Sequence, residues 1–196
     1  MKHSVLSLTA LAFMALGGCV APVGPVEVTR FHAVDVAPLG MGEIVVEPAP
    51  GGNPASLEWQ TYSAAVMRQL QLLGYSEGKA GSSGQVAQVG VSRRTLQPQG
   101  SNPVSVGVGG STGTYGSGLG LGIGINLSPK PAAQVETDLA VSIRNRASGA
   151  VLWEGRASFT VSAKSPLAST ALAAPKMSEA LFAGFPGQSG ETIEVK

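Results

Sequence analysis

Few residues of this chain have the type and spacing that chemistry requires, and the most distinctive is the only cysteine, Cys19. Of the two histidines, His3 belongs to the N-terminal leader and only His32 follows Cys19. Hydrolytic catalysis normally needs such a base beside a nucleophile. His32 lies in a β-rich segment with no motif around it. A zinc site needs three or four ligands, and His32 with Asp35 and Asp138 supplies no cluster. We therefore expect no catalytic site, no metal site and no cofactor.

Paired carboxylates are the remaining candidates for acid–base chemistry. Glu136 and Asp138 can share one face of a strand, as can Glu43 and Glu47. Strands that alternate between core and solvent commonly place acidic residues on the solvent face, however. An enzyme is for this reason the least favoured class of function.

The first 18 residues have the composition of an export signal. A short basic start, Met1–His3, precedes Val5–Leu16, an uncharged and mostly apolar run of 12 residues. This run has the length of a signal-peptide core and is too short to span a bilayer. We predict that residues 1–18 are a signal peptide that is removed.

The end of this leader indicates what happens to Cys19. Leu16, Gly17 and Gly18 stand directly before it, and signal peptidases cut after small residues. The Leu-x-Gly-Cys ending resembles the bacterial lipobox, which is cut before the cysteine once its sulfur carries a diacylglycerol. We predict Leu16, Gly17 and Gly18 as the cleavage site and Cys19 as the lipidated first residue.

A lipidated Cys19 implies a membrane address. Several acyl chains hold a protein durably, because each buried methylene contributes about 0.8 kcal/mol. Val20 is not the Asp that, by analogy with such lipoproteins, favours retention in the inner membrane, so we expect the outer membrane and its periplasmic face. Residues 19–25 are predicted to be a tether. Without Lys2 the chain has 12 basic and 12 acidic residues, a balance that disfavours nucleic acid as a partner.

Residues 26–196 are predicted to form a single domain. Apolar residues alternate at period two, which predicts strands, in residues 26–36, 43–47, 86–93, 135–146 and 151–161. A turn at Asn145–Gly149 predicts that the last two of these strands form a hairpin. Residues 190–196 are expected to form a final edge strand.

Two helices complete this prediction. The first follows Ser56, a plausible N-cap, and ends before Gly74, with apolar residues at spacings of three and four. The second is expected from about Pro175, since proline suits a first helical turn. The fold class predicted is α+β: an antiparallel or mixed β-sheet with two helices packed on one face, plus a Gly-rich β-hairpin insert.

The insert, residues 100–127, is the unusual part of the chain. Aliphatic residues alternate there with Gly, Ser or Asn on either side of a Gly/Ser/Thr cluster. The alternating aliphatic residues are Val104, Val106, Val108, Leu119, Leu121, Ile123 and Ile125. Glycine weakens a strand unless another backbone or surface approaches closely, so these residues are candidates for docking a partner.

Three alternatives remain for this insert. A long hairpin that lays its aliphatic face over the sheet is the favoured one. A docking arm that pairs with a partner's strand or sheet edge is the second. The third is a membrane-inserting hairpin that joins other copies in a shared barrel, although the Val104–Val108 arm is short for that purpose.

With its elements placed, the body resembles the DUF4136 family of bacterial domains of unknown function, most of which are lipoproteins. The matching segments are VTRFH (28–32), EIVVEP (43–48), LLGY (72–75), VGVSRRT (89–95), VSVGVGGSTG (104–113), GLGLGIG (118–124), SGAVLWEGRAS (148–158) and ALFAGFPGQSG (180–190). The resemblance implies an envelope-anchored α+β domain in which a Gly-rich hairpin is common. It implies no catalytic residues.

These observations together favour a non-enzymatic, lipid-anchored envelope protein. We expect it to face the periplasm and to act as a binding or assembly module, with an envelope protein as its partner. The alternative is an oligomeric, membrane-active protein that inserts its Gly-rich hairpin into a shared barrel. Neither the ligand nor the oligomeric state follows from the sequence.

Overall fold

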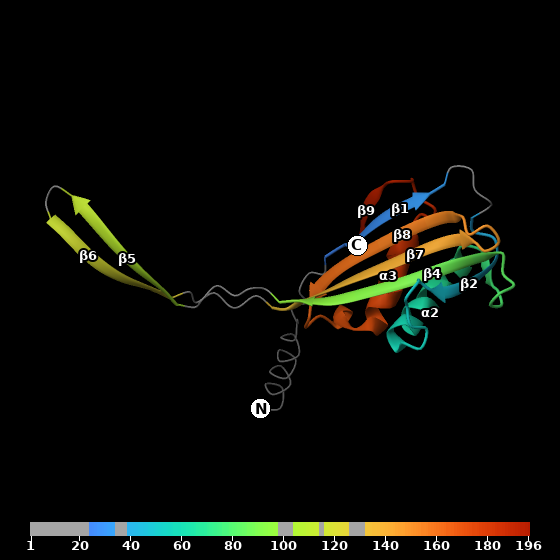
Figure 1. The fold of residues 1–196 in the computed structure, drawn as a ribbon, viewed down its shortest axis with the longest axis horizontal. Helices are drawn as coiled ribbons and strands as arrows, with labels where there is room; N and C mark the ends of the chain where they lie inside the picture. The colour runs from blue at the N-terminus through green and yellow to red at the C-terminus, as the bar shows by residue number, and fades with distance from the viewer. Residues whose placement is uncertain (1–23, 34–38, 98–103, 114–115, 126–131) are drawn as a thin grey trace, which may run out of the picture.

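A mixed sheet of seven strands, covered on one face by two helices, forms the body of the protein (Figure 1). The computed structural model describes residues 24–33, 39–97, 104–113, 116–125 and 132–196. The strands of the sheet are β1 (Val26–His32), β2 (Gly42–Pro48), β3 (Tyr75–Glu77), β4 (Gln85–Leu96), β7 (Gln134–Asn145), β8 (Val151–Ser162) and β9 (Thr192–Val195). The helices are α2 (Leu57–Leu72), α3 (Thr170–Phe182) and the short 3-10 helix η2 (Pro166–Ala168). The predicted α+β fold class is confirmed.

The strand order is β3-β2-β4-β7-β8-β1-β9. β2 runs parallel to both β3 and β4, and the other neighbours in the sheet are antiparallel. Parallel neighbours need a crossover connection, which α2 provides between β2 and β3. The antiparallel pair β7 and β8 is the predicted hairpin, and the Asn145 side chain fixes its turn by accepting from the amides of Ala147 and Ser148, each at 3.0 Å.

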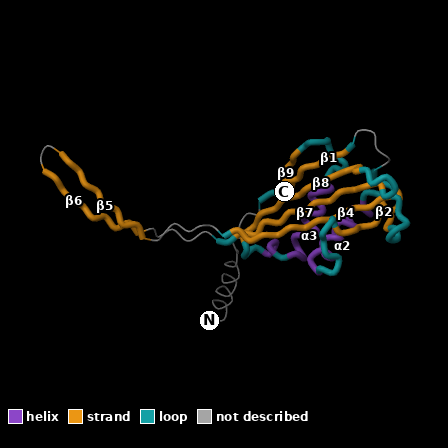
Figure 2. Tube along the Cα trace, viewed as in Figure 1, coloured by secondary structure: helices purple, strands orange, loops and turns teal. Residues whose placement is uncertain are grey.

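The core lies between the helices and one face of the sheet. Side chains alternate along each strand, so one set packs under the helices and the other set faces away from them. Figure 2 shows both helices on the same side of the strands. The fully buried apolar residues include Val26, Val28, Ile44, Tyr62, Val66, Leu70, Ala87, Val89, Leu139, Ile143, Trp153, Ala157, Met177 and Leu181.

Helix α2 begins and ends where its capping residues predict. The Ser56 hydroxyl accepts from the Trp59 amide at 3.4 Å, which satisfies one of the free donors of the first turn. Gly74 follows the last turn with φ +106°, a conformation that favours glycine. A Cβ at Gly74 would also lie 2.5 Å from the Gly40 carbonyl oxygen.

The second predicted helix is present as α3, but it begins at Thr170, five residues before the expected start, so the prediction of its first residue is wrong. Pro175 lies inside the helix. A proline there removes one hydrogen bond and costs about 3 kcal/mol. The extra turn buries Ala173 and Ala174, and this packing compensates for part of the cost. Among the described helices, none is both long and apolar enough to cross a bilayer.

Two further differences concern strands. β1 ends at His32, and the rest of its predicted span falls largely on residues 34–38, outside the described residues. β3 was not predicted, because three residues carry too short a pattern to recognise; it pairs with Gly42–Ile44 of β2.

Within the Gly-rich segment, β5 (Val104–Gly113) and β6 (Gly116–Ile125) pair antiparallel, with Val104 opposite Ile125. They form a two-stranded sheet of their own. In Figure 1 this pair stands apart from the seven-stranded sheet, so the expected packing of the insert over that sheet is not seen. The structure describes the backbone pairing of β5 and β6 but not their side chains.

The indole of Trp153 closes the core between β8 and α3. Its ring stacks on Phe182 with centroids 5.3 Å apart and meets Phe185 at 5.2 Å, and its N–H donates to the Pro186 carbonyl at 3.0 Å. The ring lies over Gly155, where a Cβ would collide with it and would lie 2.8 Å from the Leu181 side chain. Glycine at position 155 is therefore required by packing.

We expect Gly155→Ala to lower the free energy of unfolding by about 1–3 kcal/mol, because an added methyl group overpacks this site. Gly84→Ala is the matched control, since a Cβ there meets no atom within 4 Å. Urea denaturation followed by circular dichroism measures both. Equal stability of the two variants would contradict the packing role of Gly155.

Candidate functional site on the open face of the sheet

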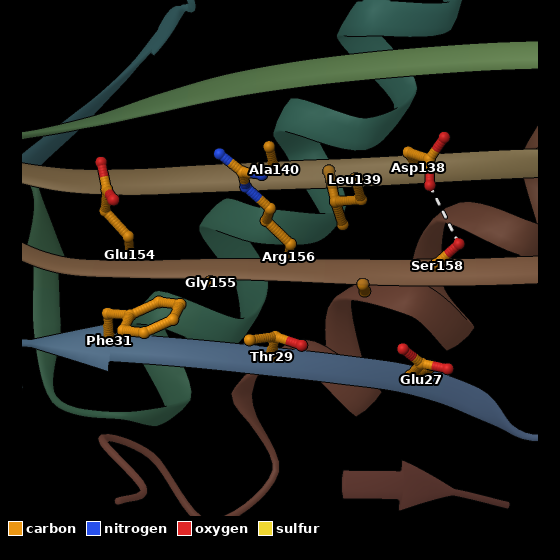
Figure 3. Close-up of a pocket in the computed structure, with 11 residues that line it drawn as sticks. Glu27, Thr29, Phe31, Asp138, Leu139, Ala140, Glu154, Gly155, Arg156 and Ser158 are labelled. Carbon is orange, nitrogen blue, oxygen red and sulfur yellow. Dashed lines mark hydrogen bonds between the residues drawn. The ribbon is translucent and has the colours of Figure 1, made fainter. Parts of the chain in front are cut away.

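The face of the sheet that the helices leave uncovered carries a shallow hollow. It lies over β1, β8 and β7 and has a volume of about 580 Å³. Figure 3 shows the side chains around it: Glu27, Thr29, Phe31, Asp138, Ala140, Glu154, Arg156 and Ser158. Period-two alternation places them there, because their neighbours Val26, Val28, Leu139 and Ala157 point into the core.

Arg156 lies at the centre of this hollow. It is opposite Ala140 on β7 and opposite Thr29 on β1, and the small Ala140 leaves the guanidinium uncovered. Among the ion pairs of the described residues, none involves Arg156. An exposed guanidinium in such a position can donate two parallel hydrogen bonds to a carboxylate of another molecule.

Carboxylates surround this arginine. Asp138 accepts from the Ser158 hydroxyl at 2.9 Å, and Glu154 lies 3.4 Å from the Ser142 hydroxyl. Glu27 is opposite Ser158 on one side and opposite Glu194 of β9 on the other. Two like charges on facing residues repel each other, so a cationic group placed there by a partner would be stabilising.

Phe31 adds an apolar contact to the same surface. Its side chain is 52% exposed although Arg30, the residue before it on β1, is buried. Aromatic residues and arginine are both enriched at protein interfaces. The hollow therefore combines an exposed aromatic ring, several carboxylates and a guanidinium that has no ion pair within the described part of the chain.

The two predicted carboxylate pairs were Glu136 with Asp138 and Glu43 with Glu47. In the structure, Glu136, Asp138 and Glu47 each bond to a different basic or hydroxyl group. Glu136 makes two hydrogen bonds with Arg94, at 2.7 and 2.8 Å, and this arginine holds the pKa of the Glu136 carboxyl below its ordinary value. Glu47 pairs with Arg146 at 2.5 Å. Asp138 instead uses the Ser158 hydroxyl.

A model of the DUF4136 family, a domain of unknown function, matches residues 46–187. The chain belongs to this family. It is also 26% identical over 215 residues to an uncharacterized protein of Zymomonas mobilis subsp. mobilis, a match that covers 88% of this chain and 80% of that protein.

Two solved structures are similar to the DUF4136 fold. One is a PDZ domain protein from Parabacteroides distasonis, at 12% identity and a TM-score of 0.50, with 94% of this chain covered. The chain spans 41% of the length of that protein. The other is the PelC dodecamer from Paraburkholderia phytofirmans, at 12% identity and a TM-score of 0.44, with 84% of this chain and 99% of that chain covered.

The histidine of this DUF4136 domain is engaged by main-chain groups. The His32 ring Nδ1 lies 3.1 Å from the Ala33 carbonyl oxygen. The Ser189 hydroxyl is close, but it accepts from the His32 amide and donates to the His32 carbonyl, each at 3.1 Å. The nearest hydroxyl is thus held by the backbone of His32 rather than by its imidazole. Within the described residues, no three His, Cys, Asp or Glu side chains gather as metal ligands.

The other predicted site residues lie outside what the structure describes. Cys19 and the cleavage residues Leu16, Gly17 and Gly18 belong to the segment 1–23. The alternating aliphatic residues of the insert stand on β5 and β6, but their side chains are not described. Their roles stay predictions.

Sequence reasoning missed a buried arginine. Arg30 is 2% exposed and points into the core side of β1. It donates to the Ala183 carbonyl at 2.5 Å, and its Nε lies 3.6 Å from Glu191. Its backbone also bonds to Glu191 and Gly190, at 3.2 and 2.8 Å. The available signal was its position in VTRFH, where alternation turns Arg30 inward.

This arginine ties the segment 183–191 to the sheet. Two glycines of the segment, Gly184 and Gly187, have positive φ, and a Cβ at Gly187 would lie 3.0 Å from the Arg30 guanidinium. The segments VTRFH and ALFAGFPGQSG, which carry much of the resemblance to the family, therefore meet here in one structural contact.

We expect Arg30→Ala to lower the free energy of unfolding by about 2–4 kcal/mol, since it removes a buried charge-assisted hydrogen bond and one partner of an ion pair. Solvent screens part of that pair, because Glu191 is 26% exposed. The exposed Arg68→Ala is the control, with an expected change within about 0.5 kcal/mol. Denaturant titration, with hydrogen exchange at the Gly190 amide, measures both. An Arg30→Ala protein as stable as the control would contradict this role.

Proposed function

We propose that this DUF4136 protein is a non-enzymatic, lipid-anchored protein of the bacterial cell envelope that binds a partner through the open face of its sheet. The observation that supports the binding role most directly is the hollow around Arg156. Its guanidinium, the exposed Phe31 ring and the nearby carboxylates present unsatisfied bonding capacity on a surface that no element of the described chain covers.

The chemistry of the face favours binding over catalysis. Two of its acidic residues are held in ion pairs, Glu136 by Arg94 and Glu47 by Arg146, and serine hydroxyls donate to Asp138 and Glu154. Such a surface suits recognition of another macromolecule, because it is broad and built from the side chains of adjacent strands. An envelope protein is the partner that we propose.

The anchor rests on the leader and on Cys19. A hydrophobic segment of signal-peptide length ends in Leu-Gly-Gly directly before the only cysteine of the chain. Val20 supports the outer membrane as the destination, and we propose that the domain faces the periplasm.

The anchor is tested with Cys19→Ser in a diderm bacterial host. We expect the parent protein to lose residues 1–18, to gain the mass of its acyl chains and to fractionate with the outer membrane. The variant, without an acceptor sulfur, is expected to keep its leader or to become soluble. Intact-protein mass spectrometry and membrane fractionation measure this. A parent protein with a bare Cys19 thiol or with Met1 retained would contradict the anchor.

The binding face is tested by photocrosslinking in intact envelopes. A photoreactive residue at Thr29, beside the hollow, is expected to give a discrete adduct, whereas one at the exposed Glu179 on α3 is expected to give none. Arg156→Ala should weaken the interaction about 30-fold, the effect of losing an interface arginine worth about 2 kcal/mol. Arg68→Ala, at an arginine that is also exposed but lies on α2, should leave the adduct unchanged. Equal adducts from both faces, or an adduct insensitive to Arg156→Ala, would contradict this role of the sheet.

A further inference from the structure

The N-terminal tether and the Gly-rich insert leave the domain at the same end of its sheet. The insert follows Leu96 of β4 and precedes Gln134 of β7, and these two residues are paired. Gln134 is also paired with Ser162, the last residue of β8. Gly24, just before β1, lies at this end as well, since a Cβ there would be 4.0 Å from the Thr160 carbonyl oxygen. Figure 1 shows the start of β1 beside these strand ends.

The strands of the insert are longer than the tether can extend. Gly24 is five positions after Cys19, and an extended chain spans at most about 3.6 Å per position, or roughly 18 Å. A ten-residue strand such as β5 or β6 rises about 3.3 Å per residue, or roughly 33 Å. A bilayer that holds a lipid on Cys19 therefore lies within the reach of the insert.

The insert also has the composition of a segment that meets lipid. From Thr95 to Pro129 the chain has no Asp, Glu, Lys, Arg or His, whereas Arg93, Arg94 and Lys130 flank this stretch. Aliphatic residues alternate with glycine through both of its strands. No charge has to be desolvated when such a segment contacts a membrane.

We propose that the Gly-rich insert docks on the phospholipid bilayer that carries the anchor, at the depth of the headgroups and the first methylenes. β5 and β6 pair with each other and with no other described strand, so each keeps an unpaired edge of backbone N–H and C=O groups. Hydrocarbon cannot satisfy those groups, and this limits the insert to the interface. The opposite end of the sheet, with the β7–β8 turn, then faces away from the membrane.

This inference takes the identity of the membrane from the proposed lipid anchor. The test below measures docking of the insert independently of whether Cys19 is lipidated in the cell. The protein from Cys19 onward, made without its leader, is coupled through the Cys19 thiol to a maleimide lipid in phosphatidylcholine vesicles. Because the attachment is chemical, the depth of the insert is measured even if Cys19 carries no lipid in the cell. Absence of natural lipidation thus contradicts the proposed function alone.

The depth is measured from tryptophan quenching by brominated phosphatidylcholine. Leu121→Trp places a probe in the insert, and Ala147→Trp places the control in the exposed β7–β8 turn. Emission of the native Trp59 and Trp153 is subtracted with the unsubstituted protein. We expect the insert probe to be quenched several-fold more than the control, most strongly by bromine near the headgroup.

Two results would overturn the proposal. One is equal quenching of the two probes, which would show an insert away from the bilayer. The other is quenching only by bromine near the ends of the acyl chains, which would show full insertion. Val106→Trp repeats the measurement on β5 if Leu121→Trp does not fold, as judged by circular dichroism.

Discussion

Seven strands and a single layer of helices impose the main constraint on this protein. A sheet has two faces, and α2 and α3 cover only one of them. The alternating side chains must therefore separate into an apolar set beneath the helices and a polar set that stays in contact with solvent. Trp153, Phe182 and Phe185 close the apolar side so tightly that position 155 admits only glycine.

None of the described helices covers the other face, so its charged side chains pair with one another or stay in contact with solvent. Some of them are paired, as in Arg94 with Glu136 on the neighbouring strands β4 and β7, and such an exposed pair adds little stability because solvent screens it. Arg156 differs in having no such pair among the described residues, and it lines the same hollow as the exposed Phe31. The inward-facing Arg30 is the opposite case, since it is buried and obtains its partners from the segment 183–191. One arginine thus serves the fold, and the other is available for recognition.

Strand order decides how the domain would be oriented on a membrane. β4 and β7 are neighbours, and β1 is separated from β7 by β8 alone, so the insert and the N-terminal segment leave from adjacent positions. If the tether and the uncharged insert both contact the membrane at this end, the strands stand roughly parallel to the membrane normal. The open face of the sheet is then accessible from the side. The matching family is a domain of unknown function, so the match implies no activity. Two residues in the sequence segments that resemble the family, Arg30 and Gly155, lie at packing contacts of the fold.

The sequence by itself determined the elements whose signals are local. Ser56 and Gly74 bound α2, Asn145 makes the β7–β8 turn, and period-two alternation marks the long strands, because capping, turn formation and alternation depend on residues close in the chain. The leader and Cys19 are likewise inferred from local pattern. Only the tertiary structure decided the strand order, the three-residue β3, the start of α3 before Pro175, and the contacts of Arg30 and Arg156. These features depend on residues far apart in sequence, whose packing outweighs local preference and leaves no periodic signal.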